Sequence, residues 1–200
     1  YGFLAENAQF AENVLATGLY WIGPEPVTIA SMGDKQKARE IAKVSNIPVL
    51  TGSPRISPNN INGASDIAHS IGFPLLIKAT AGGGGIGMQP VDELNNFERQ
   101  ILTAQNLAER SFGDPTVYLE RYIADARHIE VQIFGFGDGN GVPLFDRDCS
   151  IQRRFQKIIE EAPAAEIPRD IREKMHSAAL ALVREVRYAG AGTVELIYDR

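Results

Sequence analysis

Cysteine is nearly missing from this 200-residue sequence, in which Cys149 is the single example. One cysteine cannot form an internal disulfide, so a disulfide-stabilised fold is excluded and a reducing compartment is favoured. No apolar run approaches the roughly 18 residues that a membrane-spanning helix needs. A signal peptide is also missing from the sequence. These absences argue against a disulfide-rich secreted protein and against a membrane protein, and no membrane partner is expected.

Positive charge is not in excess, because 25 Asp and Glu outnumber 20 Lys and Arg and the formal net charge is −5. A surface that binds nucleic acid usually has a strongly basic face, so no nucleic acid partner is expected. A chain of 200 residues can form one large domain or two small ones. Because the chain starts at Tyr1 without a methionine, we interpret it as a piece of a longer protein.

The most unusual stretch that is present is a run of four glycines at residues 82–85, which follows a predicted strand ending at Lys78. Glycine loses more conformational entropy on folding than any other residue, so four in a row are costly. Successive backbone N–H groups in such a loop can form a concave site for phosphate oxygens, and Lys78 adds a positive charge beside it. A flexible hairpin tip is the alternative interpretation.

Hydrophobic periodicity and turn residues predict the remaining elements. Helices are expected over residues 5–17, from Pro26 to about Ser45 with Asp34 as a second N-cap, and over 64–71, 92–110 and 168–186. Further strands are expected over residues 19–22, 116–122, 127–136, 142–145 and 190–198, and residues 51–63 are expected to form an exposed loop. A hairpin signal at Asp138-Gly139 makes the sheet partly antiparallel, which predicts an α+β fold with an α/β start.

One predicted strand alternates between polar and apolar residues. His128, Glu130 and Gln132 share one face of it, and the residues between them are apolar. A half-exposed strand explains this alternation without any function. If the polar face turned toward the glycine run, His128 would be suited to donate a hydrogen bond to a ribose or a phosphate.

The densest group of charges lies in residues 146–157, where four cations fall within eleven positions: Arg147, Arg153, Arg154 and Lys157. Arginine forks and a lysine suit a phosphate or a small planar oxyanion, and a solvated turn is the alternative interpretation. Cys149 lies beside these charges, and we predict that it serves packing rather than catalysis.

A single carboxylate, Glu195, lies in the middle of the apolar segment 190–198. A charge within an apolar strand needs a partner, a proton or a metal ion. Because a phosphate loop is already predicted, Mg²⁺ is the natural candidate, since it binds one or two carboxylates together with phosphate oxygens. A surface glutamate on an edge strand is the alternative interpretation.

Several stretches, taken together and in order, are similar to a known family. They are YGFLAEN (1–7), IGP (22–24), MGDK (32–35), IKA with the glycine run (77–88), ERYI (120–123), RHIEVQ (127–132), RDCSIQRR (147–154), QKIIEEAP (156–163) and GAGTVE (190–195). The chain resembles the biotin carboxylase component of biotin-dependent carboxylases, a member of the ATP-grasp superfamily, along its whole length. The glycine run with SFGD (111–114) is most similar to the urea carboxylase branch.

The resemblance implies an ATP-grasp fold and a ligase activity, in which ATP phosphorylates bicarbonate to carboxyphosphate and carrier-linked biotin is then carboxylated. It implies three parts: residues 1–49 as the end of the N-terminal domain and a helical linker, 50–122 as the small lid subdomain, and 123–200 as the start of the large subdomain. Because the family's remaining catalytic residues lie on segments beyond these parts, the chain is not expected to complete the reaction alone.

The resemblance also implies a role for each candidate residue. The phosphates of ATP would be bound by Lys35, Lys78, Gly82, Gly83, Gly84, Gly85, Gly87 and Met88. Adenine would contact Glu120 and the backbone of Arg121 and Ile123, and the ribose would contact His128 and Gln152. The catalytic group at the phosphate and bicarbonate side would be Lys157, Arg153 and Arg154, and the ligand of Mg²⁺ or Mn²⁺ would be Glu195. Phe155 departs from the family pattern, which usually has His or Asn there.

The partners that the resemblance implies are bicarbonate, a biotin carboxyl carrier domain or protein, and a carboxyltransferase component. It implies a homodimer and a cytoplasmic location; a mitochondrial matrix protein without its transit peptide would have the same sequence features. Two alternatives stay open: another bicarbonate-phosphorylating ATP-grasp ligase of the carbamoyl-phosphate-synthase type, and a nucleotide-binding module without catalysis. Residues 147–154 favour the biotin enzymes over the first alternative.

Overall fold

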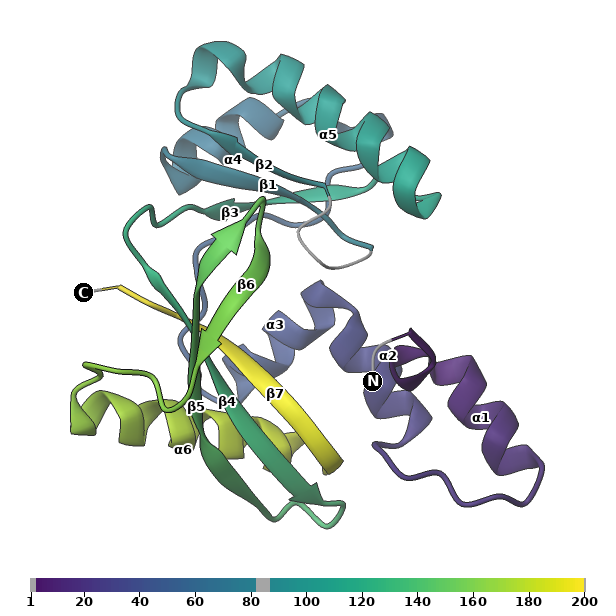
Figure 1. The fold of residues 1–200 in the computed structure, drawn as a ribbon. Helices are drawn as coiled ribbons and strands as arrows, with labels where there is room; N and C mark the ends of the chain where they lie inside the picture. Colours follow the sequence, from purple (N-terminus) through teal and green to yellow (C-terminus); the bar gives the residue numbers. More distant parts are fainter. Residues whose placement is uncertain (1–2, 82–86, 200) are drawn as a thin grey trace. The chain divides into compact units, whose positions relative to one another are not determined.

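The computed structural model describes residues 3–81 and 87–199, and the chain forms two compact units (Figure 1). The first unit contains Tyr1–Pro48, Arg127–Ile151 and Ile158–Tyr198. The second unit contains Val49–Ala126 and Gln152–Lys157, together with the last two residues of the chain. Each unit has a hydrophobic core of its own. In the part of the chain that the structure describes, no helix is long and apolar enough to cross a membrane.

The second unit is built on a three-stranded antiparallel sheet in the order β2-β1-β3. Its elements are β1 (Leu75–Ala79), β2 (Met88–Val91), β3 (Val117–Arg121), α4 (Ala64–Ile71), α5 (Phe97–Phe112) and short 3-10 helices at Pro58–Asn60 and Leu94–Asn96. The two α-helices pack on one face of the sheet, where Leu75, Ile77 and Leu119 are fully buried with Phe97 and Ile101. Because side chains alternate along a strand, the neighbouring residues of β1 and β3 line the opposite face.

The first unit is built on a four-stranded sheet in the order β6-β5-β4-β7, in which β4 pairs antiparallel with β5 and β7. Its strands are β4 (Arg127–Phe136), β5 (Gly141–Arg153), β6 (Gln156–Glu161) and β7 (Ala189–Tyr198), although residues 152–157, at the hairpin between β5 and β6, are counted with the second unit. Its helices are the 3-10 helix Phe3–Glu6, α1 (Ala8–Ala16), α2 (Pro26–Gly33), α3 (Lys35–Val44) and α6 (Arg169–Glu185). The core of this unit lies between α6 and the sheet, where Ile129, Val131 and Ile133 pack with Met175 and Val183.

Much of the predicted secondary structure is confirmed. Helix α4 and strand β4 have the predicted bounds, and the hairpin between β4 and β5 turns at the predicted Asp138-Gly139. Asp34 ends α2 and caps α3, as predicted, because its carboxylate accepts from the backbone N–H groups of Gln36 and Lys37 at 3.0 and 3.3 Å. The predicted α+β class is also confirmed by the mixture of helices and antiparallel sheets.

The strand predicted at residues 19–22 is wrong. Leu19, Tyr20 and Ile22 are 64%, 97% and 95% exposed, and none of these residues belongs to a strand. Trp21 instead donates from Nε1 to the carbonyl oxygen of Pro24 at 2.9 Å, which closes a local turn. An apolar run becomes a strand only where another strand pairs with it, and that partner cannot be read from the run itself.

Three further differences concern elements whose pairing or start the composition did not reveal. Residues 51–63 are not simply an exposed loop: Ile56 is 2% exposed and exchanges backbone hydrogen bonds with Val117 of β3 at 2.7 and 3.0 Å. Helix α5 starts at Phe97 and not at Asp92, because a 3-10 turn comes first and the fully buried Phe97 anchors the helix in the core. Strands β2 and β6 were missed, and β5 extends well beyond the strand predicted at 142–145.

Candidate functional site

The pairing of β1 with β3 brings two predicted ligand residues into contact. Leu76 lies opposite Glu120 in the antiparallel register, and Lys78 lies two residues further along β1 on the same face. The ammonium Nζ of Lys78 forms an ion pair with Oε2 of Glu120. Their side chains are only 21% and 9% exposed. The second unit therefore holds one cation and one anion, shielded from water, at the end of β1 that leads to the glycine run.

The glycine run itself lies outside the described residues, because Gly82, Gly83, Gly84 and Gly85 fall within the gap at 82–86. The flanking residues are described: Lys78 is opposite Met88 in the β1–β2 register, and Ala79 N–H donates to the carbonyl oxygen of Gly87 at 3.1 Å. Gly87 has φ +77°, and a Cβ on it would lie 3.0 Å from the Cβ of Ala79. Both observations require glycine at that position, because other residues adopt positive φ only at a cost.

The residues predicted to contact adenine lie at the end of β3 and just beyond it. Arg121 N–H already donates to the carbonyl oxygen of Thr51 at 2.8 Å, so a backbone contact to adenine would have to use the carbonyl oxygen of Arg121. The guanidinium of Arg121 donates to Ile71 O at 3.5 Å. Ile123 is half-buried in the segment that follows β3. Glu120 is thus held by its ion pair with Lys78, and Arg121 by its hydrogen bonds to Thr51 and Ile71.

Lys35 is the first residue of α3 in the first unit and is half-buried. The Asp34 carboxylate caps this helix by accepting from the N–H groups of Gln36 and Lys37 in the first turn. The positive end of the helix dipole and the lysine side chain both favour anionic ligands. The predicted phosphate role of Lys35 is thus compatible with its place in the fold.

His128 and Glu195 lie on the neighbouring strands β4 and β7, and His128 Nε2 is 3.7 Å from Glu195 Oε1. The side chain of Glu195 is 56% exposed, and β7 is an edge strand of the described sheet. The expectation that Glu195 is a charge enclosed in an apolar strand is therefore wrong, because its side chain points to solvent. An exposed carboxylate still fits a magnesium ion, which takes hard oxygen donors and keeps several of its waters.

Glu130 is only 3% exposed, so it does not lie on the solvent-exposed face of a half-exposed strand. Its carboxylate is neutralised by the guanidinium of Arg147, which also donates to Gln132 Oε1 at 3.0 Å and lies 3.8 Å from Glu160. One ligand atom each of Glu130, Glu160 and Cys149 lies within 4.8 Å of the others. Arg147 already supplies positive charge to both carboxylates of this group. Arg147 was one of the four cations predicted to bind an anion, and in the structure it has partners within the protein.

The predicted cations Arg153, Arg154 and Lys157 lie on a tight hairpin. Gln152 and Arg153 end β5, Lys157 is in β6, and the two residues between the strands, Arg154 and Phe155, have φ of +53° and +63°. Positive φ at both residues is typical of two-residue hairpin turns, although Asn and Gly usually occupy them. Arg153 and Arg154 are exposed.

The candidate residues divide between the two units. Residues 152–157 belong to the second unit, as do Lys78, Glu120, Arg121 and Ile123. Lys35, His128 and Glu195 belong to the first.

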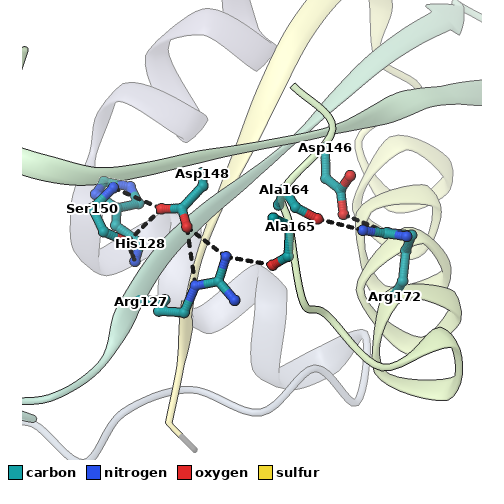
Figure 2. A network of polar contacts seen from close by, with 8 residues as sticks. All are labelled: Arg127, His128, Asp146, Asp148, Ser150, Ala164, Ala165 and Arg172. Atoms are coloured by element: carbon teal, nitrogen blue, oxygen red, sulfur yellow. Dashed lines mark hydrogen bonds and ion pairs between the residues drawn. The ribbon is translucent and has the colours of Figure 1, made fainter. Parts of the chain in front are cut away.

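Sequence reasoning missed a polar network on β5, which Figure 2 shows. Asp146 is fully buried and accepts from Arg172 Nε of α6 at 2.8 Å, and Arg172 also donates to the carbonyl oxygen of Ala164. Asp148, two residues along the same strand, accepts from Arg127 Nε at 3.0 Å. The alternation of Asp146, Asp148 and Ser150 was the available signal, but the stretch was interpreted from its cations, as an anion site, and not from its acidic residues.

The carboxylate of Asp148 is held in its charged form. Burial acts to raise the pKa of Asp148, but hydrogen bonds from Ser150 and Arg127, with the charge of Arg127, outweigh it and lower that pKa below the usual 3.8. Arg127 also donates to the carbonyl oxygen of Ala165 at 2.7 Å (Figure 2). The network thus fixes both the strand and the segment that leads to α6.

Comparison with known families matches the chain in two parts. Residues 1–29 match the family described as "Biotin carboxylase, N-terminal domain". Residues 34–200 match the family described as "Carbamoyl-phosphate synthase L chain, ATP binding domain". The chain belongs to the biotin carboxylase family. The predicted membership of this family, and the ATP-grasp fold that it implies, are confirmed.

Curated members of the family align with the whole chain. Biotin carboxylase 1 of Bacillus subtilis is 45% identical over 199 residues, which are 100% of this chain and 44% of that protein. A urea amidolyase of Lachancea kluyveri is also 45% identical over 199 residues, which are 11% of its length. The chain thus spans less than half of the relatives that it matches. Equal identities do not single out the urea carboxylase branch.

A solved member of the biotin carboxylase family has the same fold. The biotin carboxylase domain dimer of 2-oxoglutarate carboxylase from Hydrogenobacter thermophilus matches with a TM-score of 0.94 and 40% identity, over 100% of this chain and 44% of that one. That structure was determined with MgADP, ADP and bicarbonate. At this identity, the similarity extends beyond the fold to the family.

Proposed function

We propose that this chain carries the nucleotide-binding part of an enzyme that uses ATP and bicarbonate to carboxylate carrier-linked biotin. The observation that carries the proposal is the shielded ion pair of Lys78 with Glu120 at the entrance to the glycine run. In the proposal, Lys78 would bind phosphate and Glu120 would accept from the adenine amino group, and the two side chains lie on one face of one sheet. Membership of the biotin carboxylase family supports the same role.

In the proposed reaction, an oxygen of bicarbonate attacks the γ-phosphorus of ATP, and the bond between that phosphorus and the bridging oxygen of ADP breaks. The products are ADP and carboxyphosphate, which separates into CO₂ and phosphate. The N1′ of biotin loses a proton and takes up the CO₂. A closed site that excludes water would protect carboxyphosphate from hydrolysis.

The residues of this chain would divide the work by chemistry. Lys35 and Lys78 would bind the phosphates, with the backbone of the glycine run, Gly87 and Met88. Adenine would contact Glu120 and the backbone of Arg121 and Ile123, and the ribose would contact His128 and Gln152. Lys157, Arg153 and Arg154 would bind the anions at the reacting end. Glu195, whose exposed carboxylate suits a magnesium ion, would bind that ion.

We also propose the division into three parts that the resemblance implies, at residues 1–49, 50–122 and 123–200. In the longer protein, a biotin carboxyl carrier and a carboxyltransferase component would be the partners, the assembly would be a homodimer, and the location would be cytoplasmic. The dimer of the Hydrogenobacter relative, with bicarbonate bound, supports the expected assembly and substrate.

The experiment is a calorimetric titration of the chain with MgATP and with MgGTP, on the wild type and on Glu195→Gln. The proposal predicts saturable binding of MgATP, weaker binding of MgGTP, and a smaller dependence of ATP binding on Mg²⁺ in Glu195→Gln. Equal affinity for the two nucleotides would contradict the adenine assignment. An unchanged Mg²⁺ dependence in Glu195→Gln would contradict the metal assignment.

A second candidate follows from the description of the family that matches residues 34–200, which names carbamoyl-phosphate synthase. That class of enzyme also phosphorylates bicarbonate. Nucleotide titration does not distinguish the two candidate functions. They differ in which compound stimulates the formation of ADP by the intact enzyme. Stimulation by free biotin supports the first candidate, and stimulation by ammonia without biotin supports the second.

A further inference from the structure

The hydroxyl of Ser150 lies between Asp148 and His128 (Figure 2). Asp148 Oδ1 accepts from Ser150 N at 2.8 Å and from the Ser150 hydroxyl. The backbone N–H of His128 in turn donates to Ser150 Oγ at 3.0 Å. Because the Ser150 hydroxyl donates its hydrogen bond to the ionised carboxylate, a lone pair of Ser150 Oγ is left to accept from the N–H of His128. The charge of Asp148 thus fixes the direction in which Ser150 acts.

This hydrogen bond occurs just beyond the register of the two strands. The β4–β5 register runs from Gly135 opposite Gly141 to Ile129 opposite Asp148, and His128 lies one residue further. At this end of the strand pair a side chain therefore holds the backbone of His128. A substitution at Ser150 can change the orientation of His128 without dismantling the sheet.

The ring of His128 is held from the other side by β7. In the antiparallel register His128 is opposite Ile197, and Nε2 is 3.7 Å from Glu195 Oε1. A small rotation of the His128 backbone would move the ring relative to that carboxylate, because the ring lies several bonds from the amide. The amide contact and the position of the ring are therefore coupled.

We propose that Ser150, held by Asp148, is a positioning residue for His128 and thereby for the ribose of a bound nucleotide. The inference deepens the proposed function and rests on its assignment of His128 to the ribose. Ser150 itself would not touch the nucleotide.

The alternative role for Ser150 is structural support alone, and the geometry allows the two to be separated. Ser150 is exposed, so its side chain contributes little to a core. The other oxygen of Asp148, Oδ2, holds Arg127, which binds Ala165 O. Removing the Ser150 hydroxyl leaves that bridge in place, and the effect on His128 can be measured in a folded chain.

The experiment measures dissociation constants for MgATP and for Mg·2′,3′-dideoxy-ATP, which lacks both ribose hydroxyls, on wild type and Ser150→Ala. We expect Ser150→Ala to bind MgATP about fivefold more weakly, the scale of one lost hydrogen bond. Its affinity for the dideoxy nucleotide should be unchanged. Ser150→Thr keeps the hydroxyl and should restore wild-type affinity for MgATP.

The control is Asp146→Asn, which weakens the neighbouring bridge to Arg172 without touching Ser150. It should change the affinities for both nucleotides by the same factor. Loss of both affinities equally in Ser150→Ala, or no loss of either, overturns the positioning role. If the wild type binds both nucleotides equally, the ribose assignment in the proposed function fails, and the inference fails with it.

Discussion

At the scale of single residues, charge neutralisation dominates the first unit. Glu130 is buried and lies directly opposite Glu195 across the β4–β7 pair. Two carboxylates facing each other on neighbouring strands are destabilising unless a cation intervenes. Arg147 supplies that cation from β5, with its side chain 26% exposed. The stability of this part of the sheet should therefore depend on Arg147.

Arg147→Ala should lower the free energy of unfolding by about 3 kcal/mol, because it removes the guanidinium that pairs with the buried carboxylate of Glu130. Urea denaturation measures this change. The matched control is Arg169→Ala, which removes an arginine whose side chain is 93% exposed and forms an ion pair with Glu173 on the surface. That control should change stability by less than about 0.5 kcal/mol. Equal effects of the two substitutions would contradict the account.

A second residue-scale prediction concerns pH and the second unit. Asp114 accepts from Thr116 N at 2.9 Å and from Thr80 Oγ1 at 3.3 Å. Hydrogen bonds from Thr116 first, then from Thr80 and the charge of Arg55, lower the pKa of Asp114 below 3.8, although burial acts the other way. A lowered folded-state pKa contributes stability above the unfolded-state value and loses it as the pH falls through the folded-state value.

Asp114→Asn should accordingly be less stable than wild type at neutral pH. The difference should shrink below about pH 4 and be lost as the pH falls through the lowered folded-state pKa of Asp114. Urea denaturation at a series of pH values provides the measurement, and Asp92→Asn, at an exposed position of the same unit, controls for the change in net charge. A difference that grows on acidification would have the wrong sign.

At the scale of elements, the β5–β6 hairpin combines cations with an unfavourable backbone. Its two turn residues, Arg154 and Phe155, both have positive φ, which costs a residue with a side chain about 1 to 2 kcal/mol. Strain of this kind persists where the surrounding structure holds it, and it is frequent at functional sites. The departure of Phe155 from the family pattern therefore has a backbone consequence as well as a chemical one.

Phe155→Gly should raise the free energy of unfolding by about 1 kcal/mol relative to Phe155→Ala, since only glycine adopts positive φ without a steric penalty. The alanine variant is the control, because both substitutions remove the aromatic ring. Denaturant titration of the two variants gives the comparison. An alanine variant as stable as the glycine variant would show that the turn is not strained.

Elements whose signals are local were predictable from the sequence. Helix α4 ends at Gly72, and Asp34 separates α2 from α3 through its own side chain, so neither needs knowledge of distant residues. The pairing of Ile56 with Val117 was not predictable, because the two residues are far apart in the sequence, and the short strand β2 was missed although its partner β1 lies close by in the sequence. Local chemistry predicts where an element starts and ends, and pairing decides whether a polar segment becomes buried.

At the scale of the whole molecule, two units with separate cores carry the candidate residues. The sequence indicated Lys78 and Glu120 independently, but it could not predict that they form a pair, because they are 42 residues apart and meet through the β1–β3 register. The interpretation of Glu195 as a charge enclosed in an apolar strand is wrong, and the alternative, a surface glutamate on an edge strand, is what the structure shows. Register and strand order are properties of the whole sheet and not of any one strand.

The central claim is that Lys78 binds the phosphates of ATP, and the most direct test is the dissociation constant of MgATP for wild type and Lys78→Ala. The control, Lys43→Ala, removes the same charge from an exposed position on α3. The account predicts a loss of affinity of about tenfold or more for Lys78→Ala, the scale of a charged hydrogen bond, and no change for Lys43→Ala. A folded Lys78→Ala chain that binds MgATP within about twofold of wild type would contradict the account, since a lost charged hydrogen bond changes affinity by more than that.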